Sequence, residues 1–206
     1  MLVYSYLGFF ITLNFIIYIL ITIPLDLKTI LAKNPKLKRE KSPPINFRLE
    51  LGFTAVISIY FWLLFVLIPI DAIVGQEILY FSLISDLDHI NYIIQIFGII
   101  LILMGTIVAC WGRISRGTRA ISWGIPQKLE KSGMYKYIRH PLYASYCYYF
   151  IGFVLALQSL LVFPLLLGII GYYRLSKYEE DILIEIFKDE YREYQQNVGR
   201  FFPRLW

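Results

Sequence analysis

The stretch SGMYKYIRHPLYASYCYYFIGFVLALQSLLVFPLLLGIIGYYR, residues 132–174, decides the fold. Its first part is polar and ends in Arg139-His140-Pro141, whereas the 33 residues from 141 to 173 carry no charged side chain. One membrane-spanning helix needs about 20 apolar residues, so this run predicts two short or tilted helices. Gln158-Ser159, near its middle, is the expected turn. We therefore expect a helical hairpin whose mouth carries the polar sequence.

Three further apolar runs precede this hairpin, at residues 2–25, 51–70 and 92–111. The chain of 206 residues is 58% hydrophobic and only 17% charged, whereas soluble domains are nearer a quarter charged. The run 2–25 is too long for a signal-peptide core and no basic residue precedes it, so we expect it to remain as a span. The prediction is an all-α polytopic membrane protein of about five transmembrane helices, forming a single membrane domain over residues 1–206.

Positive charge distinguishes the two ends of these spans. All 20 Lys and Arg residues fall within 28–48, 113–139 and 174–204, whereas the connection 71–91 has none and carries four carboxylates. Because basic connections face the cytoplasm, we expect the N-terminus outside and the C-terminus inside. The net charge of +5 follows from this bias. The basic residues border apolar spans, so we expect a lipid bilayer and no nucleic acid as partner.

Three smaller features complete the predicted organisation. Residues 32–44 form a polar, basic connector on the cytoplasmic side, and residues 176–198 predict an amphipathic helix that lies on the membrane or folds back over the hairpin's mouth. Cys110 and Cys147 lie inside predicted spans, which favours small buried side chains and neither a disulfide nor a metal site.

Arginines follow the third span at every third residue, at positions 113, 116 and 119. They would lie along one side of a continuing helix. Two interpretations stay open, a collar of cations at the membrane surface or a contact with an anion or a lipid headgroup.

The mouth of the hairpin carries groups that suit a zwitterionic ligand. Pro141 fits the first turn of a helix, which places His140 at the helix start and Tyr143 about one turn inside. The free N–H groups of that turn favour an anion such as a carboxylate. Glu179-Glu180, just beyond the hairpin, supply the opposite charge. S-adenosylmethionine has a carboxylate, an ammonium and a sulfonium, and tyrosine faces such as that of Tyr146 can hold the sulfonium.

As a spaced set, these residues resemble the isoprenylcysteine carboxyl methyltransferase family, integral membrane enzymes related to the phospholipid methyltransferases. The set comprises Ser132-Gly133, Tyr135, Arg139-His140-Pro141, Tyr143, Glu179-Glu180, Phe187, Glu190-Tyr191, Tyr194 and Pro203. Any single piece, such as Arg-His-Pro, would be a weak signal. The resemblance covers residues 127–203, which it identifies as the cofactor-binding methyltransferase core.

The resemblance implies a fold, a cofactor and a set of site residues. Enzymes of this family bind S-adenosylmethionine in a pocket facing the cytoplasm, release S-adenosylhomocysteine, and take lipophilic acceptors laterally from the bilayer. By position, the cofactor-binding residues would be Gln127, Lys128, Leu129, Glu130, Tyr135, His140, Pro141, Leu142, Tyr143 and Glu179. Arg174 would be catalytic and would bind the acceptor together with Tyr146. Independently of the resemblance, an amine acceptor would need a base to keep it neutral, and Glu180 or a tyrosine is a candidate. No metal is implied.

One departure from the family pattern affects the acceptor. An Arg commonly stands four residues before the first glutamate, and here Leu175 occupies that position. Arg174 and Lys177 flank it, so either cation is a candidate to face the acceptor.

The predicted reaction is methyl transfer from S-adenosylmethionine to a lipophilic acceptor, with the carboxylate of a prenylated cysteine as the first candidate. A phospholipid amine or a small thiol is an alternative. A membrane NADPH-dependent reductase with a similar Tyr-Lys-x-x-Arg-His-Pro pattern, or a non-enzymatic membrane protein, is a further alternative. A Rossmann-type methyltransferase is excluded, because no Gly-x-Gly-x-x-Gly sequence lies between a strand and a helix.

Overall fold

The computed structural model describes residues 4–31, 45–74, 88–117 and 128–204. Their helices are α1 Tyr4–Leu31, α2 Ile45–Val74, α3 Asp88–Arg116, the 3₁₀ turn η1 Gly133–Lys136, α4 Pro141–Leu157, the 3₁₀ turn η2 Leu160–Leu165, α5 Leu166–Phe187 and α6 Asp189–Asn197. Four helical segments are long and apolar enough to cross a membrane: Tyr6–Lys28, Arg48–Asp71, Tyr92–Arg116 and Leu160–Phe187. The shorter helix α4 is also apolar. These elements confirm the predicted all-α polytopic membrane protein.

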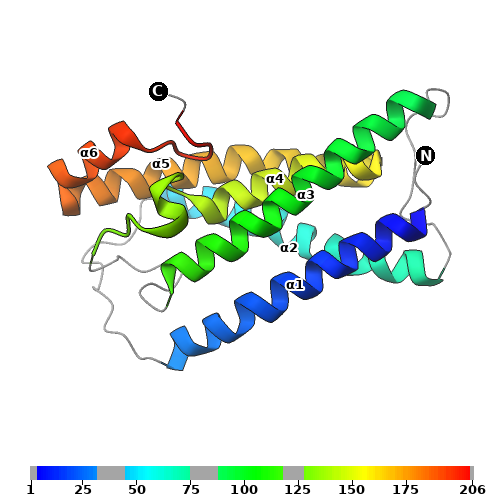
Figure 1. The fold of residues 1–206 in the computed structure, drawn as a ribbon. Helices are drawn as coiled ribbons and strands as arrows, with labels where there is room; N and C mark the ends of the chain where they lie inside the picture. Colours follow the sequence, from blue (N-terminus) through cyan, green and yellow to red (C-terminus); the bar gives the residue numbers. More distant parts are fainter. Residues whose placement is uncertain (1–3, 32–44, 75–87, 118–127, 205–206) are drawn as a thin grey trace.

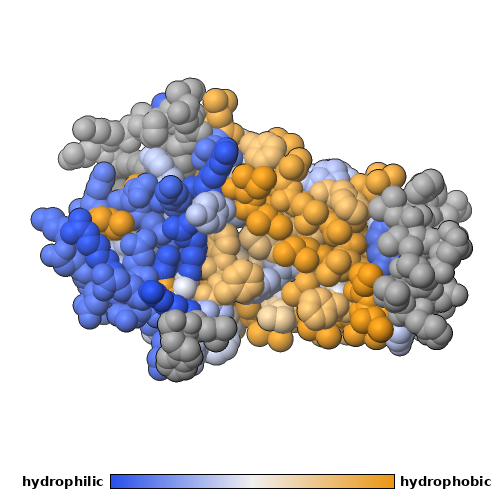
Figure 2. Space-filling view, turned by 90° about the horizontal axis from the view of Figure 1, so that it is seen from above, coloured by the Kyte–Doolittle hydropathy of each residue, from blue (hydrophilic) through white to orange (hydrophobic). Residues whose placement is uncertain are grey.

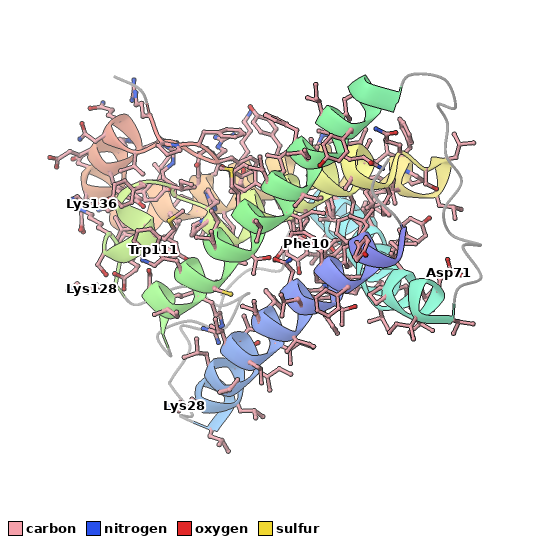
Figure 3. The ribbon with its side chains drawn as sticks, turned by 45° about the vertical axis from the view of Figure 1, so that its right-hand side comes forward. Phe10, Lys28, Asp71, Trp111, Lys128 and Lys136 are labelled. Atoms are coloured by element: carbon pink, nitrogen blue, oxygen red, sulfur yellow. The ribbon has the colours of Figure 1, made fainter. Side chains whose placement is uncertain are left out.

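The bundle has one polar end and an apolar belt. In Figure 1 the C-terminal ends of α1, α3 and α5 point toward the same end of the molecule, where α6 also lies. Hydrophilic side chains gather at that end and hydrophobic ones surround the middle of the bundle (Figure 2). Lys28, Lys128 and Lys136 lie toward this end, whereas Asp71 lies at the opposite end (Figure 3). The described residues that border the basic and acidic connections, such as Lys28 and Asp71, therefore lie at opposite ends of the bundle.

Small residues bring α3 and α4 into close contact. A Cβ atom on Gly98 would lie 2.4 Å from the backbone nitrogen of Ala156, and one on Gly112 would lie 2.9 Å from the Pro141 ring. Helices in lipid associate mainly through such tight packing, because the bilayer offers no hydrophobic drive between them. The contact extends along α3 to the start of α4, so it fixes the position of the Arg-His-Pro sequence.

The hairpin turns where the sequence predicts it. Gln158 ends α4 in the left-handed region, with φ of 49°, and its N–H donates to the carbonyl of Val154 at 3.0 Å. The Ser159 side chain then accepts a hydrogen bond from the N–H of Leu161, which starts η2. The chain reverses here and returns along α5 to the polar end.

The charged C-terminal stretch is divided differently from the prediction of one helix over residues 176–198. Helix α5 continues from the apolar region to Phe187 without a break, and Lys188, with φ of 49°, separates it from α6. Helix α6 folds back, because Tyr191 and Tyr194 pack in one cluster with Leu129, against side chains of α5 that include Phe187. The amphipathic segment therefore covers the mouth of the hairpin.

Arg113 joins the polar ends of α1 and α3. Its Nε donates to Asp26 Oδ1 at 2.7 Å, and its NH1 group donates to the carbonyl of Gly117, just beyond the end of α3. Arg119 lies outside the described residues.

Cys110 and Cys147 are buried and unbridged, as expected.

Candidate functional site

Two sequence stretches that lie almost forty residues apart meet at the polar end of the bundle. The Tyr143 hydroxyl, on α4, donates to Glu179 Oε1 on α5 at 2.9 Å. His140 Nδ1 lies 3.4 Å from Glu179 Oε2, and His140 Nε2 lies 3.1 Å from Glu180 Oε1. The His140 and Tyr143 rings are parallel, with centroids 5.6 Å apart. The predicted groups therefore form one constellation.

Local structure explains how these side chains are presented. His140 has a non-helical backbone, with φ of −124°, and its carbonyl accepts the first helical hydrogen bond from Ala144. Pro141 follows at the first helical position, where its missing N–H costs nothing. On α5, consecutive residues are rotated by about 100°, so the two glutamates diverge. The Glu179 side chain is 34% exposed, whereas that of Glu180 is 2% exposed.

Glu180 is the centre of a buried hydrogen-bond cluster. Its Oε1 accepts from Arg139 Nε at 2.9 Å and from Arg200 Nε at 3.2 Å, in addition to its contact with His140. Its Oε2 accepts from Gln195 Nε2 at 2.9 Å and from Arg200 NH2 at 2.5 Å. This carboxylate therefore links α4, α5, α6 and the segment that follows α6.

That segment, residues 198–202, is called here the C-terminal strap. The backbone N–H of Arg139 donates to the Gly199 carbonyl at 2.8 Å, and that of His140 donates to the Arg200 carbonyl at 3.1 Å. The Tyr148 hydroxyl donates to the carbonyl of Phe201, whose ring stands edge-on to His140. The strap thus holds the start of α4 in place.

Burial and neighbouring charges shift the pKa values of His140 and Tyr135 at the site. Burial alone would lower the pKa of His140, but its contacts with Glu179 and Glu180 raise it above its ordinary value overall. Burial raises the pKa of Tyr135, the nearby Arg116 guanidinium opposes that shift, and Glu179 adds to it. Tyr135 therefore lies within the electrostatic reach of both Arg116 and Glu179.

The remaining predicted cofactor residues border this constellation or lie outside the described residues. Leu129 is buried under α6, and the Glu130 carboxylate accepts from the backbone N–H of Ser132 at 3.1 Å. Lys128 is exposed, and Pro141 packs against α3 at Gly112. Leu142 is half-buried. Gln127 is not among the described residues.

The predicted acceptor residues lie apart from one another. Arg174 is 60% exposed and its NH1 group lies 3.5 Å from Glu50 Oε1 of α2. Lys177 is exposed as well. Tyr146 points into the bundle, where its ring stacks on Tyr172 with centroids 4.7 Å apart. The structure brings His140, Tyr143 and Glu179 together, and it directs Arg174 toward α2.

Several residues of this region carried only a partial sequence signal. Arg116 belongs to the arginine repeat after the third span, for which an anion contact was one of two interpretations. Gln195 and Arg200 lie far along the chain from His140 and have no distinguishing spacing. Only the return of α6 and of the strap brings them to Glu180. In the part of the chain that the structure describes, no group of three or more His, Cys, Asp or Glu side chains is placed to hold a metal ion.

Comparisons with known proteins point to the same part of the chain. Residues 93–190 match the model of the phospholipid methyltransferase family. Methanethiol S-methyltransferase from Pseudomonas deceptionensis is 39% identical over 75 residues, which are 35% of this chain and 27% of that protein. Methanethiol S-methyltransferase 1 from Bradyrhizobium diazoefficiens is 31% identical over 78 residues, which are 38% of this chain and 27% of that protein. The match thus spans about a quarter of the length of these relatives. Residues 93–190, just under half of the chain, are thus similar to the phospholipid methyltransferase family, the relationship that the C-terminal motif predicts.

Proposed function

We propose that the protein is a membrane methyltransferase that uses S-adenosylmethionine at the polar end of its bundle and methylates a small thiol. The observation that carries the proposal is the partly exposed Glu179 carboxylate, held between Tyr143 and His140 inside the family-matched region. The basic residues gather at the same end, so the positive-inside rule supports a cytoplasmic site and C-terminus. The N-terminus of the described bundle is then extracytoplasmic.

The residues at this end fit the proposed cofactor. Glu179 offers a partly exposed carboxylate for the ammonium group or the ribose hydroxyls. Arg116, near Tyr135, offers a cation for the carboxylate. The parallel rings of His140 and Tyr143 offer aromatic faces for the sulfonium. When bound, S-adenosylmethionine would supply an electrophilic methyl group on this cation.

The chain's own groups then hold and orient the reactants. Tyr143 fixes one oxygen of Glu179 by a hydrogen bond. Pro141-Leu142 and residues 128–130 would contribute backbone to the cofactor site. Glu180 is buried and already accepts hydrogen bonds from four side chains. We therefore assign Glu180 a positioning role, through His140, in place of the base that the sequence suggested. Alignment and exclusion of water are the main contributions that methyl transfer to a thiolate requires.

Aromatic packing below Tyr143 supports a small acceptor. The Tyr143 and Tyr172 rings have centroids 5.1 Å apart, and the Tyr146 ring stacks on that of Tyr172. Trp62 Nε1 donates to the Tyr146 hydroxyl at 3.2 Å, and Phe150 is fully buried behind them. A prenyl chain would have to displace these rings to enter the bundle, which favours a smaller acceptor. The two relatives are named for methanethiol, which is such a thiol.

A second candidate acceptor is the carboxylate of a prenylated cysteine. Arg174 supports it, because this guanidinium is largely exposed at the outer surface of α5, beside the exposed apolar side chain of Ile170. A prenyl chain lying on that surface would bring its carboxylate to Arg174 after release of Glu50. This arrangement would leave the aromatic cluster intact.

Methyl transfer by the purified protein tests the proposal. The protein in detergent is incubated with methyl-labelled S-adenosylmethionine and, separately, methanethiol, ethanethiol, N-acetyl-S-farnesylcysteine or phosphatidylethanolamine. We expect labelled dimethyl sulfide from methanethiol and no label on the phospholipid. Label on farnesylcysteine alone would favour the second candidate, and no product from any acceptor would reject methyl transfer.

Cofactor binding is measured independently of the acceptor. We expect S-adenosylhomocysteine to raise the unfolding temperature of the protein and NADPH to leave it unchanged, whereas the reverse would favour a reductase. Replacing Glu179 by Ala should abolish S-adenosylhomocysteine binding in calorimetry. The matched control is Glu185→Ala, an exposed glutamate on the same helix, which should bind like the wild type.

A further inference from the structure

A buried hydroxyl beside the site lacks a hydrogen-bond partner among the described residues. Tyr191, on α6, is 1% exposed, and its hydroxyl makes no hydrogen bond to any of them. Burying a hydroxyl without a partner is unfavourable and rare in folded proteins. Such a group therefore calls for an explanation, and a ligand atom that completes its hydrogen bonding is one.

Neighbouring residues on α6 show that Tyr191 faces the site. Side chains three and four residues apart lie on one side of a helix. The residue three further on, Tyr194, donates from its hydroxyl to the Tyr135 carbonyl at 2.5 Å. The residue four further on, Gln195, donates to Glu180 Oε2 at 2.9 Å. Tyr191 precedes both by one turn on the same side, and its ring contacts that of Tyr194.

The charges near Tyr191 keep its hydroxyl protonated. Burial raises the pKa of Tyr191, the Glu180 carboxylate raises it further, and the Arg139 guanidinium opposes the shift. The hydroxyl is therefore a donor at neutral pH. Glu180 is near enough to affect it, but both oxygens of that carboxylate already accept hydrogen bonds from other side chains.

The surroundings of Tyr191 suit a flat nucleoside. Its ring belongs to an apolar cluster with Leu129, Tyr194 and Val198. Leu129 belongs to the segment 128–130 proposed to line the cofactor through its backbone. His140 and Glu179 form the charged constellation proposed for the amino-acid end. The Tyr191 ring itself packs among apolar side chains, with Glu180 within electrostatic reach of its hydroxyl.

We propose that the Tyr191 hydroxyl donates a hydrogen bond to the nucleoside part of S-adenosylmethionine, at an adenine nitrogen or a ribose oxygen. The proposal rests on the proposed function and extends it, because it makes α6 a wall of the cofactor site. It also gives the orphan hydroxyl its partner. In the absence of ligand, the same hydroxyl is a local source of instability.

The experiment compares the wild type with Tyr191→Phe, which removes only the hydroxyl. Calorimetry in detergent measures the Kd for S-adenosylhomocysteine and for 5′-methylthioadenosine, which keeps the nucleoside and lacks the amino-acid end. We expect Y191F to bind both ligands about 5–20-fold more weakly, the range of one lost hydrogen bond. Its unfolding temperature without ligand should equal or exceed that of the wild type, which also shows that it folds.

Two further variants separate the possible outcomes. Tyr137→Phe, the same change at an exposed tyrosine, should bind both ligands like the wild type. Glu179→Gln should lose affinity for S-adenosylhomocysteine far more than for 5′-methylthioadenosine when Glu179 holds the ammonium, and for both ligands when it holds the ribose hydroxyls. Unchanged affinity of Y191F for both ligands would overturn the role of Tyr191 and leave the proposed function standing. Failure of the wild type to bind either ligand would overturn both proposals.

Discussion

The Glu180→Gln substitution removes one negative charge from the point where α4, α5, α6 and the C-terminal strap meet. The Glu180 and Arg139 side chains are 2% and 8% exposed, so water cannot readily replace the lost charge at either. Glutamine keeps the shape of the side chain, but its NH2 group cannot accept the hydrogen bonds from Gln195 and Arg200. The substitution therefore leaves the buried Arg139 guanidinium without its carboxylate.

The expected loss of stability follows from this burial. Breaking a buried ion pair by removing one partner costs about 3–5 kcal/mol. Arg200 is 22% exposed and can turn partly toward water, so we expect a value of about 3 kcal/mol. At roughly 2–4 °C per kcal/mol for a chain of this size, the unfolding temperature should fall by about 6–12 °C.

Thermal unfolding in one detergent, followed by tryptophan fluorescence, measures this change. The control is Glu185→Gln, an exposed glutamate on α5, which should shift stability by less than about 0.5 kcal/mol. E180Q should also weaken S-adenosylhomocysteine binding, because His140 loses one of its two carboxylate neighbours. A shift as small as that of the control, with unchanged binding, would refute the view that Glu180 organises the site.

Two further predictions concern groups around this cluster, and a third concerns the contact between α3 and α4. The raised pKa of His140 means that its charge stabilises the fold fully below about pH 6.5, the ordinary value, and that this contribution is lost as pH rises through the higher folded value. The difference in unfolding temperature between wild type and His140→Gln should therefore shrink from pH 5.5 to 8.5, and a constant difference would contradict it. Tyr143→Phe removes the hydrogen bond to Glu179 and should weaken S-adenosylhomocysteine binding by about 3–10-fold, and equal affinity in calorimetry would show that this hydroxyl does not orient Glu179. Gly98→Ala would press a methyl group against the backbone of α4 at Ala156 and should lower stability by about 1–3 kcal/mol in thermal unfolding, and a stability equal to wild type would show that α3 can move away.

The hairpin illustrates how much of the fold is predictable from local sequence. An uncharged run of 33 residues is too long for one membrane-spanning helix of about 20 residues, and its polar Gln158-Ser159 pair is the natural place for a turn. The structure has the turn at that pair. The bounds of the C-terminal helices could not be predicted as well, because the periodic pattern of charged residues over 176–198 continues across Lys188. Only the backbone conformation at that residue divides them.

The candidate site was likewise predictable in part from the sequence and in part only from the structure. His140, Tyr143 and Glu179 were identifiable because a Pro at a helix start and paired carboxylates after an apolar span are unusual in a membrane protein. The sequence identified Arg174 as a candidate cation for the acceptor but did not show which way its side chain points, since one residue along a helix rotates a side chain by about 100°. The structure turns it toward Glu50 of α2.

The order of residues alone determined that this chain crosses a membrane, where its hairpin turns, and which end collects positive charge, because hydropathy, chain reversal and charge bias act over neighbouring residues. Tertiary structure decided that Gln195 and Arg200 reach Glu180, and that the hydroxyl of the buried Tyr191 has no hydrogen-bond partner among the described residues. These contacts join segments that no local pattern relates. They form because a buried carboxylate must find donors wherever the folded chain brings them.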